Sequence, residues 1–286
     1  MTIELSPTTL DSLITLDGLT RGSGDAAYRG NLDPTFTIGP KVHGGSIQMM
    51  IAAAARRALS ELADPADEVA VIAIASDFLA APDPAPVELH ASLIKTGRTV
   101  SLMRVDVRQN DRLMVTSTVT LGRPDHGDAR FRGPTPVSDL DVAPPADAPG
   151  LYSTSVGEVV HLGAAIEVVL DMDHFPALRG ETGEPLVRGW TRPKAADVPA
   201  TVQAGFPVLV CDLSPPVVMN LGMFGWAPTV QLTTYVSRVP AAGWLRFAAS
   251  AQEVGQGMFA EDHVVVDATG ATVAQSRQLA LIPAAR

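Results

Sequence analysis

Three polar residues in the second half of the sequence stand where the first half has unreactive ones. Asp212, Thr229 and Gln278 provide a carboxylate, a hydroxyl and an amide. A carboxylate can accept a proton, and the other two groups can orient a small polar molecule by hydrogen bonds. Their counterparts in the first half are Ala52, Val71 and Thr120. This asymmetry predicts one reactive site in each chain.

The comparison of the two halves rests on an internal repeat. A shift of 158 residues (97 to 255) aligns one long stretch without a gap, and a weaker match follows a shift of 160 (42 to 202). The matched pairs are Gly97 and Gly255, Val107 and Val265, Val115 and Val273, Leu121 and Leu279, Val42 and Val202, and Gly45 and Gly205. A solenoid needs three or more short units. We therefore predict two related domains packed as a pseudo-dimer.

The composition is that of an ordinary globular chain. It has 286 residues, of which 46% are apolar and 18% charged, enough for two domains with a sizeable core. The net charge of −10 argues against broad nucleic-acid binding. No apolar run reaches the roughly 18 residues of a membrane span. We expect no nucleic acid and no membrane as partners.

The compartment is predicted from the first residues and from cysteine usage. The segment MTIELSPTTLDSL has neither the basic nor the apolar region of a signal peptide. The single Cys211 has no second cysteine with which to form an internal disulfide. These features predict a cytoplasmic protein.

Apolar spacing predicts the elements that position the three polar residues. In the first half, apolar residues at intervals of three and four predict a helix over 43–62 after an extended segment at 25–38. Runs rich in Val, Ile, Leu and Thr then predict strands at 69–79, 86–96, 99–109 and 112–121. A helix laid on antiparallel strands is an α+β layout.

The second half repeats this order. The predicted strands are 155–173, 186–194, 228–238, 244–254, 257–267 and 272–282, and a shorter helix is predicted over 199–213. Residues 123–149 are dominated by Pro, Gly and Asp and are predicted to be a linker. The domains are then 1–122 and 150–286.

Several segments resemble the acyl-CoA thioesterase II family. They are HGG at 43–45, VCDLSPP at 210–216, PTVQLTTYVSR at 228–238 ahead of Trp244, and VAQSRQLAL at 273–281. The resemblance covers nearly the whole chain and implies a double hotdog, in which each domain is a long helix wrapped by a curved antiparallel sheet. It also implies an acyl-CoA substrate and hydrolysis to a free fatty acid and CoA. The six His residues show no ligand-like spacing with Cys or acids, so we expect no metal and no cofactor.

In that family an Asp, a Thr or Ser, and a Gln hold and activate a water molecule. By position these residues match Asp212, Thr229 and Gln278. The same three residues are the asymmetric ones of the internal repeat. Thr233 follows on the same predicted strand, two pleats on and on the same face as Thr229, so it is an alternative hydroxyl.

The oxyanion of thioester hydrolysis needs hydrogen-bond donors, which a helix N-terminus offers. Gly44 and Gly45 open the first predicted helix and leave the backbone accessible. His43 precedes them, and we favour a structural role for it over that of a base. We expect one site shared between the halves, with glycines from the first and Asp212 from the second.

Other residues are candidates for holding the two ends of acyl-CoA. Phosphate contacts are predicted for Arg188, Arg192 and Lys194, and a second basic cluster is Lys95 and Arg98. An acyl tunnel is predicted from the segment 216–227 and from flexible apolar side chains. These are Met49, Met50, Met219, Met223 and Phe224. Each also has an ordinary interpretation, as a charged edge or as core.

Two alternative functions stay open. A hotdog hydratase or dehydratase typically carries an Asp-x-Asn-Pro-x-His run, and the nearest string here is NLDP at 31–34, without a suitably placed His. A non-catalytic acyl-CoA binding protein would not need Asp212, Thr229 and Gln278. Edge strands and apolar faces left by two packed domains lead us to expect a homo-oligomer.

Overall fold

The computed structural model describes residues 10–63 and 69–284. Its helices are α1 (Leu10–Ile14), α2 (Gly44–Leu62) and α3 (Ala200–Val210). The strands of the first half are β1 (Asp17–Arg21), β2 (Asp25–Asn31), β3 (Thr37–Ile38), β4 (Lys41–Val42), β5 (Ala70–Phe78), β6 (Pro86–Lys95), β7 (Val100–Gln109) and β8 (Arg112–Gly122). Those of the second half are β9 (Ile166–Leu170), β10 (Leu186–Pro193), β11 (Thr229–Val236), β12 (Leu245–Ser250), β13 (Met258–Val266) and β14 (Thr272–Leu281).

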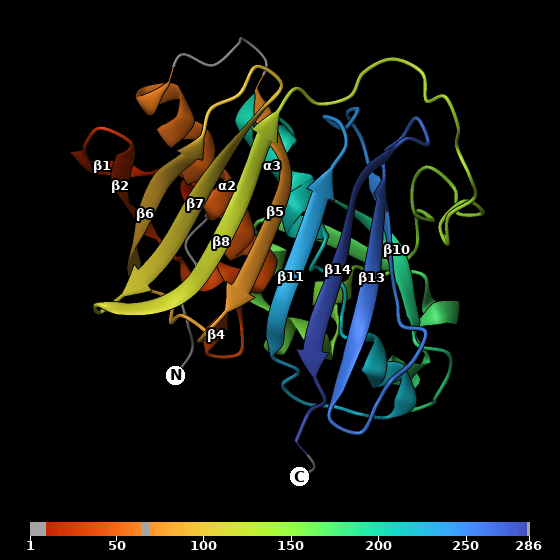
Figure 1. The fold of residues 1–286 in the computed structure, drawn as a ribbon. Coiled ribbons are helices and arrows are strands. Elements are labelled where there is room, and N and C mark those ends of the chain that lie inside the picture. Colours follow the sequence, from red (N-terminus) through yellow and green to blue (C-terminus); the bar gives the residue numbers. More distant parts are fainter. Residues whose placement is uncertain (1–9, 64–68, 285–286) are drawn as a thin grey trace.

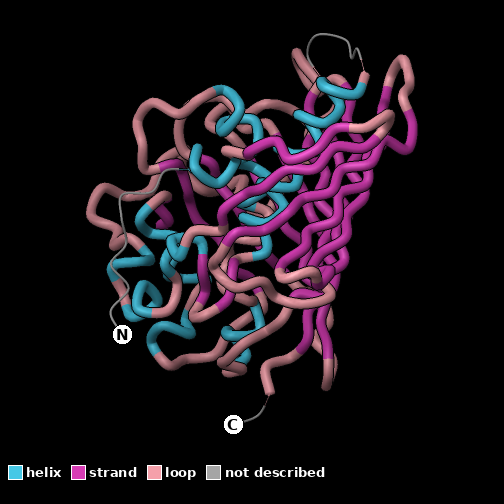
Figure 2. The backbone as a smooth tube through the Cα atoms, turned by 90° about the vertical axis from the view of Figure 1, so that its left-hand side faces the viewer, coloured by secondary structure: helices cyan, strands magenta, loops and turns pink. Residues whose placement is uncertain are grey.

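One 12-stranded antiparallel sheet runs through both halves, with the helices on one side of it (Figures 1 and 2). The strand order is β1-β2-β6-β7-β8-β5 followed by β11-β14-β13-β12-β10-β9. The second series is the first one reversed, with each strand replaced by its repeat counterpart. Each half is a helix packed on six strands, so the predicted α+β double hotdog is confirmed.

The two halves join where β5 pairs with β11. Ala75 pairs with Thr233, which is its own counterpart at the shift of 158 (75 to 233). On either side of this pair the counterparts are Ile74 with Leu232 and Ser76 with Thr234. The pairing crosses them over, because Ser76 pairs with Leu232 and Ile74 pairs with Thr234. A pseudo-twofold axis therefore passes through Ala75 and Thr233, as expected for a pseudo-dimer.

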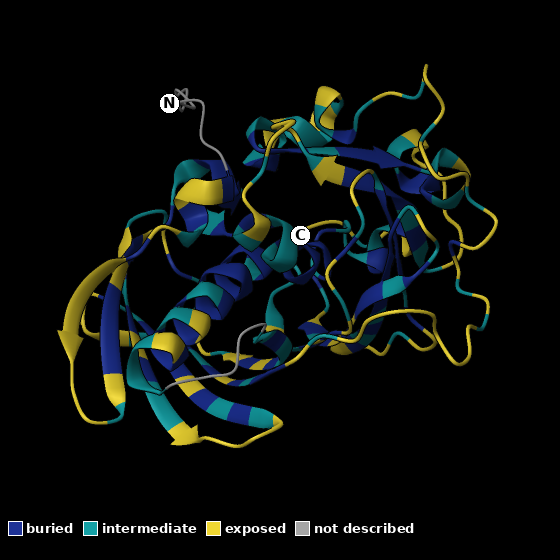
Figure 3. Cartoon of the chain, turned by 90° about the horizontal axis from the view of Figure 1, so that it is seen from above, coloured by how far each residue is buried: buried dark blue, intermediate teal, exposed yellow. Residues whose placement is uncertain are grey.

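The helices follow the same symmetry at the shift of 160 (45 to 205). A Cβ at Gly45 would lie 2.5 Å from the Leu209 carbonyl oxygen, whereas one at Gly205 would lie 3.4 Å from Met49. The second pair is the repeat counterpart of the first. Most residues of α2 are buried between the sheet and α3 (Figure 3). The small alanine side chains of α2 let α3 and the strands approach it closely.

The gap-free alignment of the repeat is wrong by one residue in the last hairpin. Val105 pairs with Ser117, and its counterpart His263 pairs with Ser276, so the shift in β14 is 159 (117 to 276). Between the equivalent pairs Val107–Val115 and Val265–Ala274, the second hairpin contains one residue more than the first. Gln278 therefore corresponds to Val119 and not to Thr120, and the polar asymmetry becomes stronger.

The range 155–173 is not one strand. Three short 3-10 helices, η2 (Leu151–Ser153), η3 (Ser155–Glu158) and η4 (His161–Ala164), precede β9, which spans only Ile166–Leu170. Gly157 and Gly163 explain the difference, because a Cβ at either glycine would collide with Tyr152. This segment folds tightly on itself instead of extending.

The segment predicted as a linker packs onto the second half. Val137 is fully buried in a small cluster with Ala248, Val264 and Val266. The Trp190 indole N–H donates to the carbonyl of Asp141 at 2.8 Å. No described residue between 123 and 150 lies in a helix or strand, yet part of this stretch covers the sheet of the second half.

Candidate active site

Asp212 lies in the turn directly after α3 and not on the helix itself, where the sequence pattern placed it. The helix ends at Val210, and the Asp212 N–H donates to the carbonyl of Leu209 at 3.2 Å. Its counterpart Ala52 lies in the middle of α2, which continues for ten more residues to Leu62. The Pro215-Pro216 pair prevents such a continuation, so the acid is placed at a helix end.

The start of α2 receives the Asp212 carboxylate. The Gly45 N–H donates to Asp212 Oδ2 at 2.7 Å, and the His43 ring donates from Nε2 to the Asp212 carbonyl at 2.7 Å. His43 Nδ1 accepts from the Ser46 N–H at 3.2 Å, which caps the helix. A negative group is favoured at this helix end. The contact joins the two halves of the chain.

The two glycines allow this close approach. A Cβ at Gly44 would lie 2.7 Å from Asp212 Oδ2 and 3.4 Å from the Phe78 ring. A Cβ at Gly45 would lie 2.5 Å from the Leu209 carbonyl oxygen. Because the Gly45 N–H is already used by Asp212, it is not a free oxyanion donor. The Gly44 N–H makes no hydrogen bond within the described part of the chain.

The electrostatics of Asp212 suit a proton acceptor. Burial raises the pKa of Asp212 above its usual range, while nearby His43 and the hydrogen bond from Gly45 oppose the increase. The side chain is still 10% exposed. A carboxylate with an elevated pKa binds a proton more tightly than an exposed one, which is required of a general base.

Thr229 and Gln278 meet on the inner face of the sheet. The Thr229 hydroxyl donates to Gln278 Oε1 at 3.3 Å. The Gln278 side chain is buried, and Thr229 opens β11. No hydrogen bond joins either of them directly to Asp212 within the described residues. Ser276, two residues before Gln278 on the same buried face of β14, donates to the carbonyl of Cys211, the residue before Asp212, at 2.8 Å. This contact brings β14 against the turn that carries Asp212.

Thr233 is not an alternative to Thr229, because the two lie on opposite faces. A β-bulge in β11 between Thr229 and Gln231 shifts the alternation by one residue. Thr229 pairs with buried Ala280, whereas Thr233 pairs with Arg277, which is exposed on the outer face. Sequence alternation alone could not show this.

Glu261 is a fourth polar residue of the cluster, and the sequence reasoning missed it. Its Oε1 accepts from the Val217 N–H at 2.8 Å, and its Oε2 accepts from Gln278 Nε2 at 3.1 Å. Burial raises the pKa of Glu261 to about 8, and the Asp212 charge adds to the increase. The repeat could have revealed it, because its counterpart at the shift of 158 (103 to 261) is Met103.

The polar cluster is confined to the second half. The structural counterparts of Asp212, Thr229, Gln278 and Glu261 are Ala52, Val71, Val119 and Met103, in that order. All four are buried and apolar. The mirror-image position therefore lacks both the acid and its neighbours.

The basic residues predicted to contact phosphate have other partners. Arg188 is 11% exposed and forms ion pairs with Asp139 and Asp171. Arg192 pairs with Glu167 and stacks on the Trp244 ring, and Lys194 donates to the Gly163 carbonyl. These contacts do not support phosphate binding by the three residues, which stays a prediction.

The predicted acyl-binding residues fall into two groups. Met49 and Met50 are fully buried core residues of α2. Met219 and Met223 are half-buried, and Phe224 is 55% exposed. The segment after Asp212 forms a 3-10 helix, η7 (Val217–Leu221), whose first N–H binds Glu261. The lining of an acyl tunnel by this segment stays a prediction.

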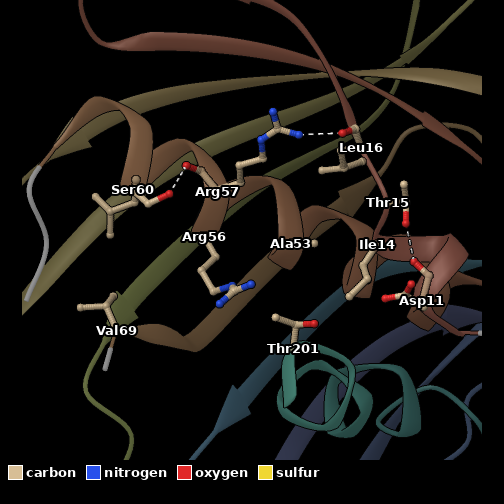
Figure 4. Close-up of a pocket in the computed structure, with 11 residues that line it drawn as sticks. Asp11, Ile14, Thr15, Leu16, Ala53, Arg56, Arg57, Ser60, Val69 and Thr201 are labelled. Carbon is tan, nitrogen blue, oxygen red and sulfur yellow. Dashed lines mark hydrogen bonds between the residues drawn. The ribbon is translucent and has the colours of Figure 1, made fainter. Parts of the chain in front are cut away.

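A cavity of about 450 Å³ lies between α1, α2 and the start of α3 (Figure 4). Ala53 lines it, next to the counterpart of Asp212, and Thr201 faces it from α3. Its charged residues are Asp11, Arg56 and Arg57, and Arg57 is bound to Leu16 and Glu61. This cavity lies on the side of the molecule without the polar cluster, and we assign no chemistry to it.

Comparison with known proteins decides the family. The description "Acyl-CoA thioesterase N-terminal domain" matches residues 32–122, and "Acyl-CoA thioesterase C-terminal domain" matches residues 137–282. The chain belongs to the acyl-CoA thioesterase family. Asp212, Thr229, Gln278 and Glu261 all fall within the C-terminal match, whereas Gly44 and Gly45 fall within the N-terminal one.

Three proteins of similar length resemble this chain over nearly its whole length. An uncharacterised protein of Mycobacterium tuberculosis is 36% identical over 295 residues, covering 97% of this chain and 98% of the relative. A proposed thioesterase II of Thermobifida fusca has a TM-score of 0.80 at 27% identity, with 98% and 99% of the two chains covered. A protein of unknown function with a hot dog fold, from Alicyclobacillus acidocaldarius, has a TM-score of 0.73 at 20% identity and covers 97% and 98%.

One further property follows from the described helices. None of them is long and apolar enough to cross a membrane.

Proposed function

We propose that this protein hydrolyses acyl-CoA thioesters by activating water with Asp212. The observation that carries the proposal is the buried Asp212 carboxylate, which accepts the Gly45 N–H across the interface of the two halves at 2.7 Å. That bond occupies Oδ2 and leaves Oδ1 for a water molecule. An elevated pKa makes the carboxylate a stronger base than an ordinary Asp.

The proposed reaction has two steps. Water attacks the thioester carbonyl carbon while its proton passes to Asp212, and a tetrahedral intermediate forms. The carbon–sulfur bond then breaks, and the CoA sulfur leaves with a proton from Asp212. Thr229 accepts a hydrogen bond from the water, and Gln278 fixes the Thr229 hydroxyl through their mutual hydrogen bond. The products are a free acid and CoA thiol.

The Gly44 N–H is the proposed donor to the developing oxyanion. It lies at the N-terminus of α2, where backbone N–H groups point out of the helix and the helix dipole favours negative charge. The Gly45 and Ser46 N–H groups are bound to Asp212 and His43. A thioester oxygen at Gly44 would lie next to Asp212, and the site would use both halves of the chain.

The role of Asp33 does not favour the alternative function, a hotdog hydratase or dehydratase. Asp33, in the string NLDP, accepts the Thr35 N–H at 2.8 Å and caps a short 3-10 helix. That role is structural, and no His accompanies it.

The test is release of free thiol from acyl-CoAs of increasing chain length. Asp212→Asn keeps the size of the side chain and can still accept the Gly45 N–H, but it removes the proton acceptor. We expect turnover to fall by about 100-fold or more, with an almost unchanged melting temperature. Asp262→Asn, an exposed carboxylate on β13, is the matched control. Full turnover in Asp212→Asn would reject Asp212 as the base, and binding without thiol release by the wild type would favour a binding protein.

A further inference from the structure

Glu261 stands at the end of a chain of hydrogen bonds. Both of its oxygens accept, one from the Val217 N–H and one from Gln278 Nε2. The other end of the same amide, Oε1, accepts from the Thr229 hydroxyl. Glu261 is 1% exposed, so no bulk solvent competes for these bonds.

The direction of this chain is set by Glu261. An ionised carboxylate can only accept, so the amide nitrogen of Gln278 must face it and the amide oxygen must face Thr229. The Thr229 hydrogen is then used on Gln278. The Thr229 oxygen can only accept a further hydrogen bond, and a water molecule beside it must donate.

We propose that Glu261 is a positioning residue that orients the Gln278 amide, and through it Thr229, so that both hydrogens of the attacking water are held. One water hydrogen goes to Asp212 and the other to Thr229. The lone pair of the water is then free to attack the thioester carbon. The proposal rests on the proposed hydrolysis, and Glu261 itself touches neither water nor substrate.

Protonation of Glu261 reverses the chain. The proton must reside on Oε2, because Oε1 faces a backbone N–H that cannot accept. The Glu261 O–H would then face the Gln278 N–H, and two donors repel each other. A 180° rotation of the Gln278 amide removes this repulsion. Gln278 Nε2 then faces Thr229, whose hydrogen turns toward the water and occupies its lone pair. The active form therefore needs Glu261 ionised.

The groups around Glu261 favour such a titration near neutral pH. Burial and the Asp212 charge raise the pKa of Glu261 to about 8. His263 lies two residues along the same buried face of β13, and burial lowers its pKa to about 4, so it stays neutral over this range. His43 lies 3.6 Å from Asp212 Oδ2 and belongs to the other half. Asp212 and Glu261 titrate as a coupled pair.

The first test reads the amide without activity. In the full chain carrying ¹⁵N-labelled glutamine, the side-chain signal of Gln278 is assigned by its loss in Gln278→Met and followed from pH 6 to pH 10. We expect it to move in the wild type with an apparent midpoint near the pKa of Glu261. It should move in Asp212→Asn as well, with a lower midpoint because the Asp212 charge that raises the pKa of Glu261 is gone. In Glu261→Gln it should not move. A signal that is independent of pH in the wild type would overturn the proposal.

The second test is a double-mutant cycle on thiol release. Glu261→Gln keeps the shape but presents an N–H₂ group, so we expect about a 10-fold lower kcat, KM within twofold, and loss of the rise in kcat through about pH 8. In a Gln278→Met background the same substitution should have no further effect. Equal losses in both backgrounds would show that Glu261 acts independently of Gln278. Asp262→Asn, on the opposite face of β13, is the matched control.

The two tests separate this proposal from the proposed function. A wild type that releases no thiol but shows the titrating Gln278 signal would keep the hydrogen-bond chain and reject hydrolysis. Thiol release by a wild type whose Gln278 signal does not change with pH would reject the hydrogen-bond chain and keep hydrolysis. If Glu261→Gln does not fold, the wild-type titration still decides, since it needs no substitution at 261.

Discussion

At the scale of single residues, the site depends on which direction each polar group faces. The bulge in β11 turns Thr229 inward to Gln278, while Thr233 turns outward beside Arg277. The same residue type therefore occurs twice on one strand, once in the polar cluster and once on the exposed face. This contrast provides a matched pair of substitutions.

We predict that Thr229→Val lowers turnover and Thr233→Val does not. Valine keeps the shape of threonine but can neither donate to Gln278 nor accept from water, and we expect a loss of about 10- to 100-fold in kcat. Both variants should fold, because valine suits a strand. The measurement is steady-state thiol release. Equal activity of the two variants would remove Thr229 from the mechanism.

Stability should fall as pH rises above about 7, because of the buried carboxyl groups. The pKa of Glu261 is about 8 in the fold against an ordinary 4.5, so the native state binds its proton more tightly than the unfolded state does. This contribution is fully present below about pH 4.5 and is lost as pH rises through about 8. Asp212, whose pKa is also raised, acts with the same sign.

The measurement is the melting temperature of the wild type and of Glu261→Gln between pH 7 and pH 9, above the range in which buried His263, with its pKa lowered to about 4, acts with the opposite sign. We expect a clear decline in the wild type and a flatter curve in the variant. The slope is the decisive quantity, because the substitution also changes hydrogen bonds. Asp262→Asn should keep the wild-type slope, and parallel curves for all three proteins would contradict a buried titration at Glu261.

At the scale of elements, the contact between the start of α2 and the end of α3 positions Asp212. Gly45 lies against the Leu209 carbonyl, and its symmetry counterpart Gly205 lies against the flexible Met49 side chain. The tighter contact occurs on the side with the acid. The internal repeat thus supplies a control within the same chain.

We predict opposite effects of alanine at these two glycines. Gly45→Ala places a Cβ 2.5 Å from a backbone oxygen, and we expect about 1–3 kcal/mol of destabilisation together with loss of activity. Gly205→Ala makes an ordinary contact at 3.4 Å within a helix. We expect its free energy of unfolding to stay the same or to rise by up to about 0.5–1 kcal/mol. Chemical denaturation and thiol release measure both. Similar losses at both positions would show that the close approach is not specific to the acid side.

At the scale of the whole molecule, a buried polar network joins the halves beside the pseudo-twofold axis. Gln48 of α2 donates to Ser76 at 2.9 Å and to the Leu232 carbonyl at 2.9 Å, and it accepts from Thr234 at 2.8 Å. Ser76 also bonds Ser117 at 2.8 Å. These groups are buried, so each bond lost leaves a polar atom without water.

We predict that Gln48→Leu lowers the free energy of unfolding by about 1–3 kcal/mol, because Thr234 and the Leu232 carbonyl lose a buried partner. Gln231→Leu is the matched control, since Gln231 crosses the same seam to Asp77 but on the exposed face. We expect a change within about 0.5 kcal/mol there. Chemical denaturation of both variants is the measurement. An equal change in the two variants would show that the buried hydrogen bonds of Gln48 do not stabilise the junction of the two halves.

The sequence by itself determined the architecture and marked three residues of the proposed site. Apolar periodicity predicted α2 to within one residue, because helix and strand periods are local properties. The repeat and the resemblance together marked Asp212, Thr229 and Gln278, because a duplicated chain exposes the positions where its copies differ in polarity.

Only the tertiary structure decided how these residues face one another. The bulge that separates Thr229 from Thr233 and the extra hairpin residue that aligns Gln278 with Val119 are pairings between distant strands, which no local pattern records. The partnership of Gly45 with Asp212 likewise depends on two helix ends meeting across the pseudo-twofold axis. Glu261 reads locally as one more polar residue in a strand, and it gains its significance from burial beside Asp212 and Gln278.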